Sequence, residues 1–311
     1  MFKKKILILG GSGFISDNFS KNLKNKFQIY RTHYKNPKKK SIFFDVKKSS
    51  VNNLFKTKIK PDVIIYAAGI SNHSYCIINK KKSKSINVFA NIKQISKIIK
   101  SKTKIIFLST QMVYSGVKGN YSEKDRPFPK LEYSKHKYEV EKFIKKNTKN
   151  YLILRLAKVI GLSKNKKDPI NLFLKDLDKN EKVILATDQI SNYLYIDDLN
   201  KILEEAIEND IKGIFNVGGS KSTSRYKFFY DFIKKFDSLK IHKIKKCKID
   251  EINFYERQPR DTSFNLSKFN KFFNIKTMSF KEFNNIIVKN LKLWKKYIRT
   301  NHFVEHVIQK D

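Results

Sequence analysis

Cysteine is scarce in this sequence, since Cys76 and Cys247 are the only two among 311 residues. They stand far apart and form neither a CxxC pair nor the framework of a disulfide-stabilised domain, so we expect a reducing compartment. The sequence also has no run of about 18 apolar residues, which excludes a membrane-spanning helix. The apolar run within the N-terminal MFKKKILILGG is too short for a secretory signal and ends in glycines. These absences predict a cytoplasmic protein.

Acidic residues are also few: 28 Asp and Glu stand against 67 Lys and Arg, giving a net charge of +39. This charge has two interpretations, an anionic partner such as nucleic acid or a membrane surface, or lysine-rich usage on solvated faces. We favour the second, because the lysines occur throughout the chain and no zinc-finger, RNP or basic-zipper pattern accompanies them. We therefore expect no specific nucleic-acid partner. A positive surface would still attract a phosphorylated substrate.

The N-terminal segment has the pattern of a dinucleotide-phosphate site. Residues 5–9 are an aliphatic run typical of a buried parallel strand, and GGSGFIS follows before an amphipathic segment. In such a unit Gly10 permits the tight turn, Gly13 lets the backbone approach a pyrophosphate, and the helix N-terminus faces its charge. Ser16 stands where a third glycine is common, and a turn without ligand is the alternative. The predicted cofactor contacts here are Gly10, Ser12, Gly13, Phe14 and Ile15.

The next two predicted strands would meet the adenosine end of the cofactor. Residues 27–31 are the second strand, and QIYRTHYK offers no acid for a free ribose 2′-hydroxyl. Arg31 stands where a 2′-phosphate could be paired, which favours NADP over NAD, with an ordinary surface arginine as the alternative. Residues 41–46 are the third strand, ending in Asp45 and Val46. Asp45 could accept from the adenine amine or simply cap the following turn.

The predicted fourth strand ends in small residues. PDVIIYAAG puts Ala67, Ala68 and Gly69 at its carboxyl end. Small side chains there leave room for a cofactor in the crevice of a parallel sheet, although a tight strand–loop junction needs the same residues. A helix is predicted over residues 86–99. Asn87, near its start, either faces the active site or caps the helix.

Strand and helix patterns alternate up to a sixth strand at residues 151–155, which predicts an α/β fold with a Rossmann-type, doubly wound parallel sheet. We expect residues 1–160 to form the NAD(P)-binding domain. Residues 161–311 would form a smaller, mixed α/β substrate-binding lobe interleaved with the end of the sheet. There the patterns predict helices over residues 168–177, 196–207, 225–236 and 280–298, with strands at 182–185 and 213–217. Asp197 and Asp198 are predicted to cap the second of these helices.

Residues 109–141, STQMVYSGVKGNYSEKDRPFPKLEYSKHKYEVE, contain the candidate catalytic groups. Tyr133 opens a predicted helix and Lys137 follows four residues later, so the two side chains lie on one face. Because a neighbouring ammonium favours the phenolate, we expect the pKa of Tyr133 to fall towards neutral pH. Thr110 follows a predicted strand at residues 105–108, and its hydroxyl could hold a substrate oxygen. The three groups could move a proton at a carbinol or carbonyl centre, although any basic helix can contain YxxxK.

Three segments resemble the extended short-chain dehydrogenase/reductase family, which acts on nucleotide sugars. They are the 109–141 segment, RLAKVIGL after the sixth strand, and RQPRDTSFNLSKF late in the chain. Within that family the chain is most similar to the dTDP-4-dehydrorhamnose reductase group. The resemblance implies reduction of a nucleotide-linked keto sugar by NADP(H), or by NAD(H), in polysaccharide precursor synthesis. It implies that Tyr133 donates the proton, that Lys137 lowers its pKa and holds the nicotinamide ribose, and that Thr110 binds the substrate oxygen.

The resemblance also implies a site for a nucleotide-diphosphate sugar. Two arginines would face the diphosphate, which suits bidentate guanidinium pairing. Related dehydratases carry Asp-Glu where Gln111 and Met112 stand, which argues against dehydration. A nucleotide-sugar epimerase and a non-catalytic dinucleotide-binding subunit are the alternatives, and a homodimer is one possible assembly. The substrate-binding residues implied are Gln111, Val113, Tyr114, Arg257 and Arg260.

One further motif is set aside. His302, Glu305 and His306 match the H-x-x-E-H zinc pattern, but they fall in the last ten residues with no third ligand evident. We interpret the match as chance and expect no metal site.

Overall fold

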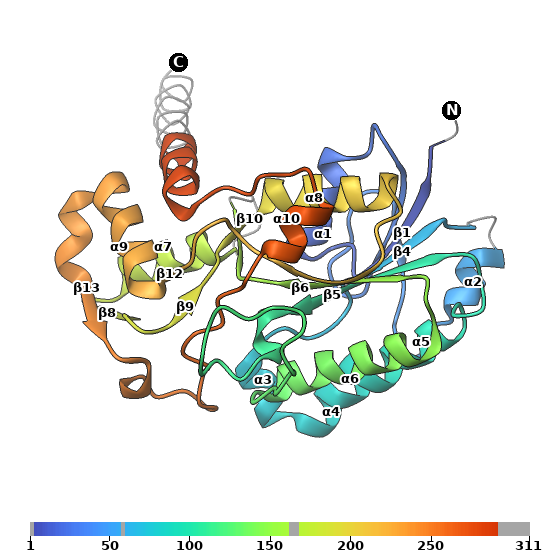
Figure 1. Ribbon diagram of the computed structural model, residues 1–311, viewed down its shortest axis with the longest axis horizontal. Helices are drawn as coiled ribbons and strands as arrows, with labels where there is room; N and C mark the ends of the chain where they lie inside the picture. The colour runs from blue at the N-terminus through green and yellow to red at the C-terminus, as the bar shows by residue number, and fades with distance from the viewer. Residues whose placement is uncertain (1–2, 57–59, 162–167, 292–311) are drawn as a thin grey trace, which may run out of the picture.

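The computed structural model describes residues 3–56, 60–161 and 168–291. Its centre is a seven-stranded sheet in the order β11-β6-β5-β4-β1-β2-β3 (Figure 1), in which every neighbouring pair is parallel. The prediction of a Rossmann-type, doubly wound α/β fold is confirmed. The strands are β1 (Lys5–Leu9), β2 (Gln28–His33), β3 (Ser41–Phe43), β4 (Val63–Tyr66), β5 (Lys104–Thr110), β6 (Tyr151–Leu156) and β11 (Gly213–Val217).

Helices cover both faces of this sheet because its strands carry apolar side chains on both faces. In β1, for example, Ile6 and Ile8 enter one hydrophobic core and Leu7 and Leu9 enter the other. The first core is covered by α1 (Phe14–Asn22), α8 (Ile196–Glu208) and α10 (Ser267–Phe272). The second is covered by α2 (Val51–Lys56), α5 (Asn91–Ser96) and α6 (Glu132–Asn147), on the lower side in Figure 1.

A smaller lobe lies to the left of the sheet in Figure 1. Its two main helices are α7 (Pro169–Lys179) and α9 (Arg225–Phe236), and residues 280–291 form the described part of a last helix. β11 and α8 come from the second half of the chain yet belong to the central sheet and its cover, so the two parts are interleaved. Three short ladders complete the lobe: β7 (Val159–Ile160) with β10 (Leu194–Tyr195), β8 (Val183–Ala186) with β13 (Ile244–Cys247), and β9 (Ile190–Ser191) with β12 (Thr223–Ser224).

Two local predictions differ from the structure. The helix expected over residues 86–99 is a π-helical turn, Ser85–Ala90, followed by α5, and it continues from α3 (His73–Ile78) and α4 (Lys80–Lys84). The prediction that Asp197 and Asp198 cap α8 is wrong. Tyr195 is the N-cap residue without a side-chain cap, and Asp198 accepts a hydrogen bond from the Met278 backbone at 2.8 Å instead. A tertiary contact competes with the local cap for this carboxylate.

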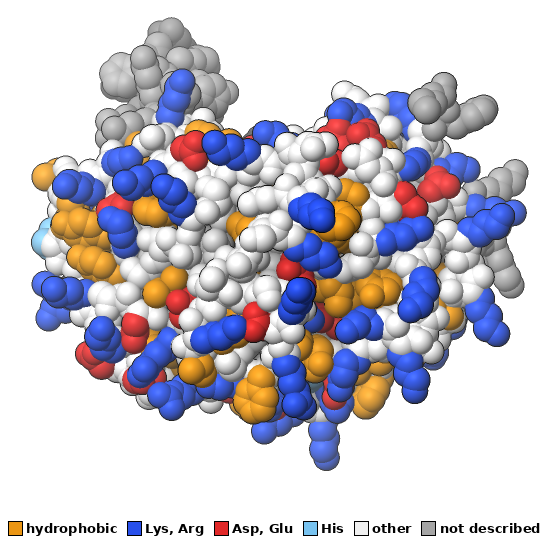
Figure 2. All heavy atoms as spheres, in the orientation of Figure 1, with side chains coloured by type: hydrophobic (Ala, Val, Ile, Leu, Met, Phe, Trp, Pro, Cys, Tyr) orange, Lys and Arg blue, Asp and Glu red, His pale blue; other side chains and the backbone are white. Residues whose placement is uncertain are grey.

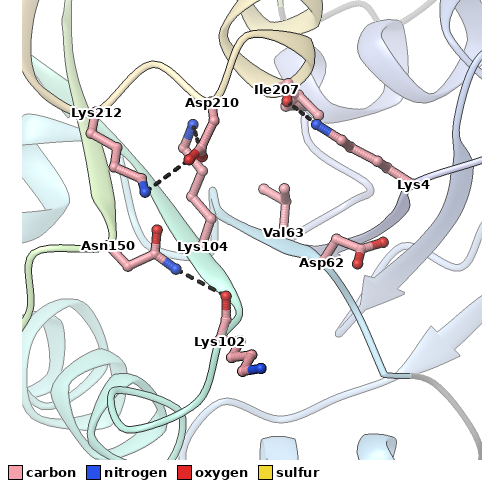
Figure 3. A pocket seen from close by; sticks show the side chains of 9 residues that line it. All are labelled: Lys4, Asp62, Val63, Lys102, Lys104, Asn150, Ile207, Asp210 and Lys212. Carbon is pink, nitrogen blue, oxygen red and sulfur yellow. Dashed lines mark hydrogen bonds and ion pairs between the residues drawn. The ribbon is translucent and has the colours of Figure 1, made fainter.

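A pocket opens at the amino ends of the strands (Figure 3), the edge opposite to the predicted site. Lys104 is nearly buried there, and its ammonium donates to the Ala206 carbonyl at 2.9 Å and pairs with Asp210 at 3.2 Å. Lys4 donates to the Ile207 carbonyl at 2.6 Å. These lysines therefore neutralise the carbonyl end of α8. The lining residues are Lys4, Asp62, Val63, Lys102, Lys104, Asn150, Ile207, Asp210 and Lys212.

On the face drawn in Figure 2, Lys and Arg side chains are spread across the surface instead of gathering in one patch. Within the described residues, no helix is long and apolar enough to cross a membrane. The same residues contain no group of three His, Cys, Asp or Glu side chains placed to hold a metal ion. The segment with His302, Glu305 and His306 lies outside the described part of the chain.

Candidate active site at the carboxyl ends of the strands

The glycine turn after β1 has the geometry that a dinucleotide site needs. Gly10 has φ +85°, and a Cβ placed on it would lie 2.6 Å from the Ala68 backbone nitrogen. Only glycine permits both the conformation and the contact. The end of β1 therefore packs directly against Ala67, Ala68 and the end of β4, at the point where the sheet order changes direction.

The helix that follows presents its N-terminus to the same crevice. Gly13 is the N-cap of α1 and makes no side-chain cap bond. The first-turn N–H groups of a helix need acceptors, and a phosphate is a suitable one. Ser12, Phe14 and Ile15 lie beside this turn, as the sequence predicts, and their contact with a cofactor stays a prediction. The residues present fit a dinucleotide pyrophosphate.

Arg31 lies next to the glycine turn but already has partners. Its Nη1 donates to Asp17 Oδ1 at 2.9 Å and its Nη2 to the Lys39 carbonyl at 3.0 Å. A Cβ on Gly11 would come within 2.4 Å of the Arg31 Cβ, so the arginine borders the turn closely. A 2′-phosphate would have to share this guanidinium with Asp17. Its role in NADP selectivity stays a prediction.

Thr32 is a contact that the sequence did not reveal. Its hydroxyl accepts from the Gly10 N–H at 3.0 Å and donates to the Ile8 carbonyl at 3.2 Å. The side chain thereby fixes the glycine turn on β2. The only sequence signal was a hydroxyl residue directly after the predicted strand at residues 27–31, which is not specific.

The polar contacts of the residues after β3 and β4 are mainly hydrogen bonds with backbone groups. Asp45 Oδ1 accepts from the Lys47 N–H at 2.9 Å, so the capping alternative is the one observed. The Val46 carbonyl accepts from Gln94 Nε2 at 2.9 Å. Asn87 is buried and forms two hydrogen bonds with the Ile70 backbone, at 2.7 and 2.9 Å. It thereby holds the loop that follows Gly69 in place.

Tyr133 and Lys137 lie at the same edge of the sheet. Lys137 Nζ donates to the Leu108 carbonyl at 2.8 Å and lies 6.0 Å from the centre of the Tyr133 ring. Burial lowers the pKa of Lys137 to about 8, against the opposing charge of Glu141. Thr110 ends β5 two residues after Leu108, and its hydroxyl accepts from the Met112 N–H at 3.2 Å. The structure therefore brings the end of β5 and the YxxxK helix together.

The expected fall of the Tyr133 pKa is wrong for this structure. Burial raises the pKa of Tyr133 above its ordinary value. The Lys137 ammonium is directed at a carbonyl and not at the phenol, so it does not outweigh the desolvation of the phenolate. The Tyr133 ring stacks on His73, with 5.1 Å between the ring centres. A phenol in these surroundings stays protonated at neutral pH.

A buried ion pair supports this end of β5 from behind. Glu141 and Arg155 are paired at 2.7 Å, with side chains 0% and 3% exposed. The Ser109 hydroxyl donates to the same carboxylate. Because Glu141 lies one helical turn beyond Lys137, the pair fixes α6 against β5 and β6.

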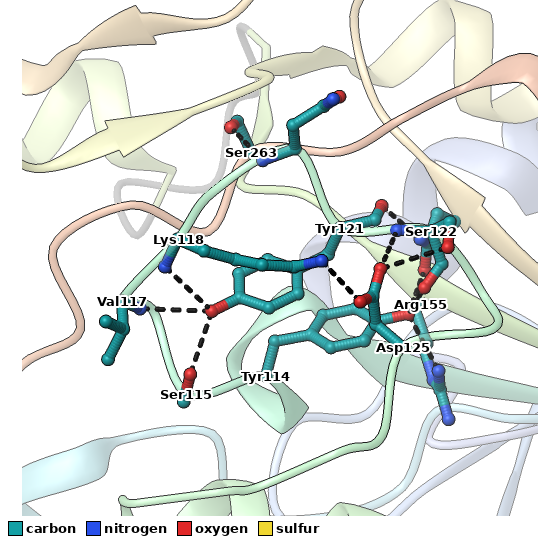
Figure 4. Close-up of polar contacts among 11 residues, drawn as sticks. Tyr114, Ser115, Val117, Lys118, Tyr121, Ser122, Asp125, Arg155 and Ser263 are labelled. Carbon is teal, nitrogen blue, oxygen red and sulfur yellow. Dashed lines mark hydrogen bonds and ion pairs between the residues drawn. The ribbon is translucent and has the colours of Figure 1, made fainter.

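Tyr114 belongs to this support and not to an open substrate site. Its ring is 1% exposed and stacks on Tyr121 at 4.5 Å, and its hydroxyl accepts from Arg155 Nη1 at 2.8 Å (Figure 4). Val113 is fully buried as well. The prediction that these two side chains line the substrate is therefore wrong, because both are used in packing. Gln111 is also buried, and its Oε1 accepts from the Ser191 hydroxyl at 2.8 Å, which ties β5 to the smaller lobe.

Arg257 and Arg260 lie together, but each is paired with an acid of this chain. Arg257 Nη2 lies 3.1 Å from Asp250 Oδ2, and Arg260 contacts the same oxygen. Their side chains are 73% and 53% exposed. A diphosphate would compete with Asp250 for them, so their role in substrate binding stays a prediction.

Residues 4–292 match the family described as RmlD substrate binding domain. The chain belongs to this family. Among curated proteins, this RmlD-family chain is 28% identical to dTDP-4-dehydrorhamnose reductase of Aggregatibacter actinomycetemcomitans over 177 residues, 54% of this chain and 59% of that protein. It is 35% identical to the bifunctional polymyxin resistance protein ArnA of Wigglesworthia glossinidia brevipalpis over 132 residues, 39% of this chain and 20% of that protein. Both matches span less than two thirds of the relative's length.

Solved structures of reductases and of an epimerase have the same fold as this chain. The dTDP-4-dehydrorhamnose reductase of Bacillus anthracis in complex with NADP is 20% identical with a TM-score of 0.78, covering 91% of this chain and 98% of that one. A hypothetical dTDP-4-dehydrorhamnose reductase from Sulfolobus tokodaii is 26% identical with a TM-score of 0.76, covering 88% and 97%. UDP-glucuronic acid 4-epimerase from Bacillus cereus, in complex with UDP-glucuronic acid and NAD, is 20% identical with a TM-score of 0.76, covering 92% and 99%.

Proposed function

We propose that this RmlD-family chain reduces a keto sugar linked to a nucleotide diphosphate, using NADPH. The observation that carries the proposal is the placement of Lys137 at the Leu108 carbonyl, with the Tyr133 ring beside it, on the same edge of the sheet as the Gly10 turn. Family membership and the NADP bound in the Bacillus anthracis reductase support it. The cytoplasm, where such nucleotide sugars are made, is the compartment we propose.

Each residue has a chemical role in this reaction. NADPH, when bound, would supply the hydride for the carbonyl carbon. Tyr133 donates its phenolic proton to the carbonyl oxygen. Its raised pKa means that the phenol is protonated before this transfer. Lys137 stabilises the phenolate that remains, and its pKa of about 8 leaves most of it charged at pH 7. The Thr110 hydroxyl holds the substrate oxygen, and the α1 N-terminus holds the cofactor pyrophosphate.

The test has two steps. Calorimetric titration compares NADPH with NADH, and NADPH oxidation is then followed with dTDP-4-dehydrorhamnose and other nucleotide-linked keto sugars. We expect NADPH to bind and at least one keto sugar to be reduced. Tyr133→Phe should bind NADPH as the wild type does but lose turnover by about 10²–10⁴-fold. Unchanged turnover in Tyr133→Phe would show that Tyr133 is not the acid. If neither NADPH nor NADH binds, the proposed reductase function is wrong.

An epimerase is the second candidate function. The likeness to UDP-glucuronic acid 4-epimerase with bound NAD favours it, because the same tyrosine and lysine can serve both reactions. An epimerase would interconvert a UDP-sugar with its epimer without net consumption of NADPH. Product analysis by NMR therefore distinguishes the two.

A further inference from the structure

Residues 67–73 join the glycine turn to the proposed acid. They run from the carboxyl end of β4 to the first residue of α3. At the start of this segment the backbone packs against Gly10, since a Cβ on that glycine would lie 2.6 Å from the Ala68 nitrogen. At its end the His73 ring stacks on the Tyr133 ring. One short piece of chain therefore touches both the turn proposed for the cofactor and the phenol proposed for the proton.

The backbone that carries His73 is held by side chains on either side of it in sequence. Asn87 accepts from the Ile70 N–H at 2.7 Å and donates to the Ile70 carbonyl at 2.9 Å. Asn72 is the N-cap of α3, and its side chain accepts from the Tyr75 N–H at 2.8 Å. Such a cap fixes the first turn of a helix. Because His73 is the first residue of that turn, its ring stands on a fixed backbone and not on a free loop.

The stacking on His73 is the contact that orients the Tyr133 ring. The ring centres are 5.1 Å apart and the ring planes are inclined by 27°, and both side chains are half-buried. In the described part of the chain no hydrogen bond holds the Tyr133 hydroxyl. The nearby Lys137 ammonium donates to the Leu108 carbonyl instead. A stacked neighbour limits the rotation of an aromatic ring about its Cβ–Cγ bond.

We propose that His73 is a positioning residue of the reduction, whose ring holds the Tyr133 phenol in the direction in which it delivers its proton. This inference rests on the proposed function and adds a residue to it. His73 acts by stacking and not by charge, because burial lowers its pKa and leaves the imidazole neutral at pH 7. A reacting group that is misplaced by about 1 Å can cost roughly 100-fold in rate. The 67–73 segment thereby ties the direction of the phenol to the cofactor turn.

The test separates the ring of His73 from its polar atoms. His73→Phe keeps a ring that can stack, whereas His73→Gln keeps a polar side chain and removes the ring. The assay is NADPH oxidation with dTDP-4-dehydrorhamnose, or with whichever of the other nucleotide-linked keto sugars the wild type reduces. We expect kcat to stay within about threefold in His73→Phe and to fall about 10–100-fold in His73→Gln.

Binding should change little in either variant, because the backbone of the 67–73 segment is kept. We expect Kd for NADPH, measured by calorimetry, and KM for the keto sugar to stay within about twofold of the wild type. Retained NADPH binding also shows that each variant is folded. His242→Ala, at an exposed position in the smaller lobe, is the control and should change nothing.

A second measurement asks whether His73 acts through Tyr133. In a Tyr133→Phe background, which has no phenolic proton to direct, His73→Gln should lower the residual turnover by less than about twofold. A further loss as large as in the wild-type background would show that the ring acts on something other than the acid, which overturns the inference.

The remaining outcomes separate this inference from the proposed function. Unchanged kcat in His73→Gln overturns the positioning role and leaves the reductase standing. Loss of kcat in His73→Phe, alone or together with His73→Gln, overturns it as well, because the hydrogen bond between His73 and the Gln258 side chain would then be what matters. If the wild type reduces no nucleotide-linked keto sugar, the proposed function itself fails, and the inference fails with it.

Discussion

Lys137 Nζ donates a hydrogen bond to the Leu108 carbonyl at 2.8 Å, across 29 residues of sequence. This contact joins the YxxxK helix to the carboxyl end of β5, where Thr110 lies. The ammonium also lies 4.7 Å from the centre of the Phe107 ring. Two neighbouring residues of β5 therefore hold it in place. Together with the Glu141–Arg155 pair, this side chain therefore fixes the YxxxK helix against the end of β5.

Replacing Lys137 should abolish turnover without unfolding the protein. Lys137→Met removes the charge that would stabilise the Tyr133 phenolate and leaves the Leu108 carbonyl without its donor. We expect kcat to fall by at least about 100-fold, as for loss of a general acid–base partner, and NADPH to bind more weakly. Steady-state kinetics measures kcat, calorimetric titration measures NADPH binding, and circular dichroism checks that the variant is folded. Lys145→Met, at an exposed position on the same helix, is the control, and an equal loss in it would contradict the specific role.

Gly10 and Gly213 form a matched pair for testing the glycine turn. Both have positive φ, +85° and +108°, but a Cβ on Gly10 would lie 2.6 Å from Ala68 N, whereas a Cβ on Gly213 meets nothing within 4 Å. Gly213→Ala should cost only the backbone strain, about 1–3 kcal/mol. Gly10→Ala should cost more and should also lose NADPH binding, because β1 and β4 must separate. Urea unfolding with an unchanged m value gives the comparison, and equal costs would show that the contact at Ala68 relaxes freely.

Arg31 offers a test of cofactor selectivity. If its guanidinium pairs with a 2′-phosphate, Arg31→Gln should weaken NADPH binding about tenfold, as loss of one charge-assisted bond implies. NADH binding should not change. Asp17→Asn should keep or raise NADPH affinity, since Asp17 is the present partner of Arg31. Arg126→Gln, an exposed arginine, controls for net charge. A similar loss for NADPH and NADH in Arg31→Gln would mean that the arginine only supports the turn.

The parts of this structure that the sequence predicts are those determined by local chemistry. The Gly10 turn, the apolar strands and the Tyr133–Lys137 spacing each depend on residues within a few positions of one another, so their patterns are visible in the sequence. The doubly wound parallel sheet then follows from the alternation of strand and helix.

The parts that the sequence did not predict depend on residues brought together from afar. Tyr114 stands beside the predicted catalytic hydroxyl, but Arg155 and Asn216 engage its hydroxyl in the core. Arg31 has a partner on α1, since its Nη1 donates to Asp17 Oδ1. The direction of the Tyr133 pKa failed for the same reason, because burial depends on the whole fold and not on a helical spacing.

Lys104 gives a pH dependence of stability that can be isolated from the active site. Burial lowers its pKa from 10.5 to about 8, with Lys212 and Lys4 also lowering it and Asp210 opposing them. Between about pH 8 and 10.5 the unfolded chain therefore binds more protons at this residue than the folded one, so the free energy of unfolding rises with pH there. Below about pH 8 both states are protonated and the contribution is flat. Lys104→Met should remove this rise relative to the wild type in urea unfolding between pH 7 and 10.5.

The control for Lys104 lies in the same pocket (Figure 3). Lys102 is exposed and its ammonium has no partner among the described residues, so Lys102→Met should keep the wild-type pH dependence. Other lysines with lowered pKa values, such as Lys137 and Lys158, contribute the same slope to both variants and cancel in the comparison. A rise that persists unchanged in Lys104→Met would show that its ammonium is solvated in solution, and that the cap on α8 opens.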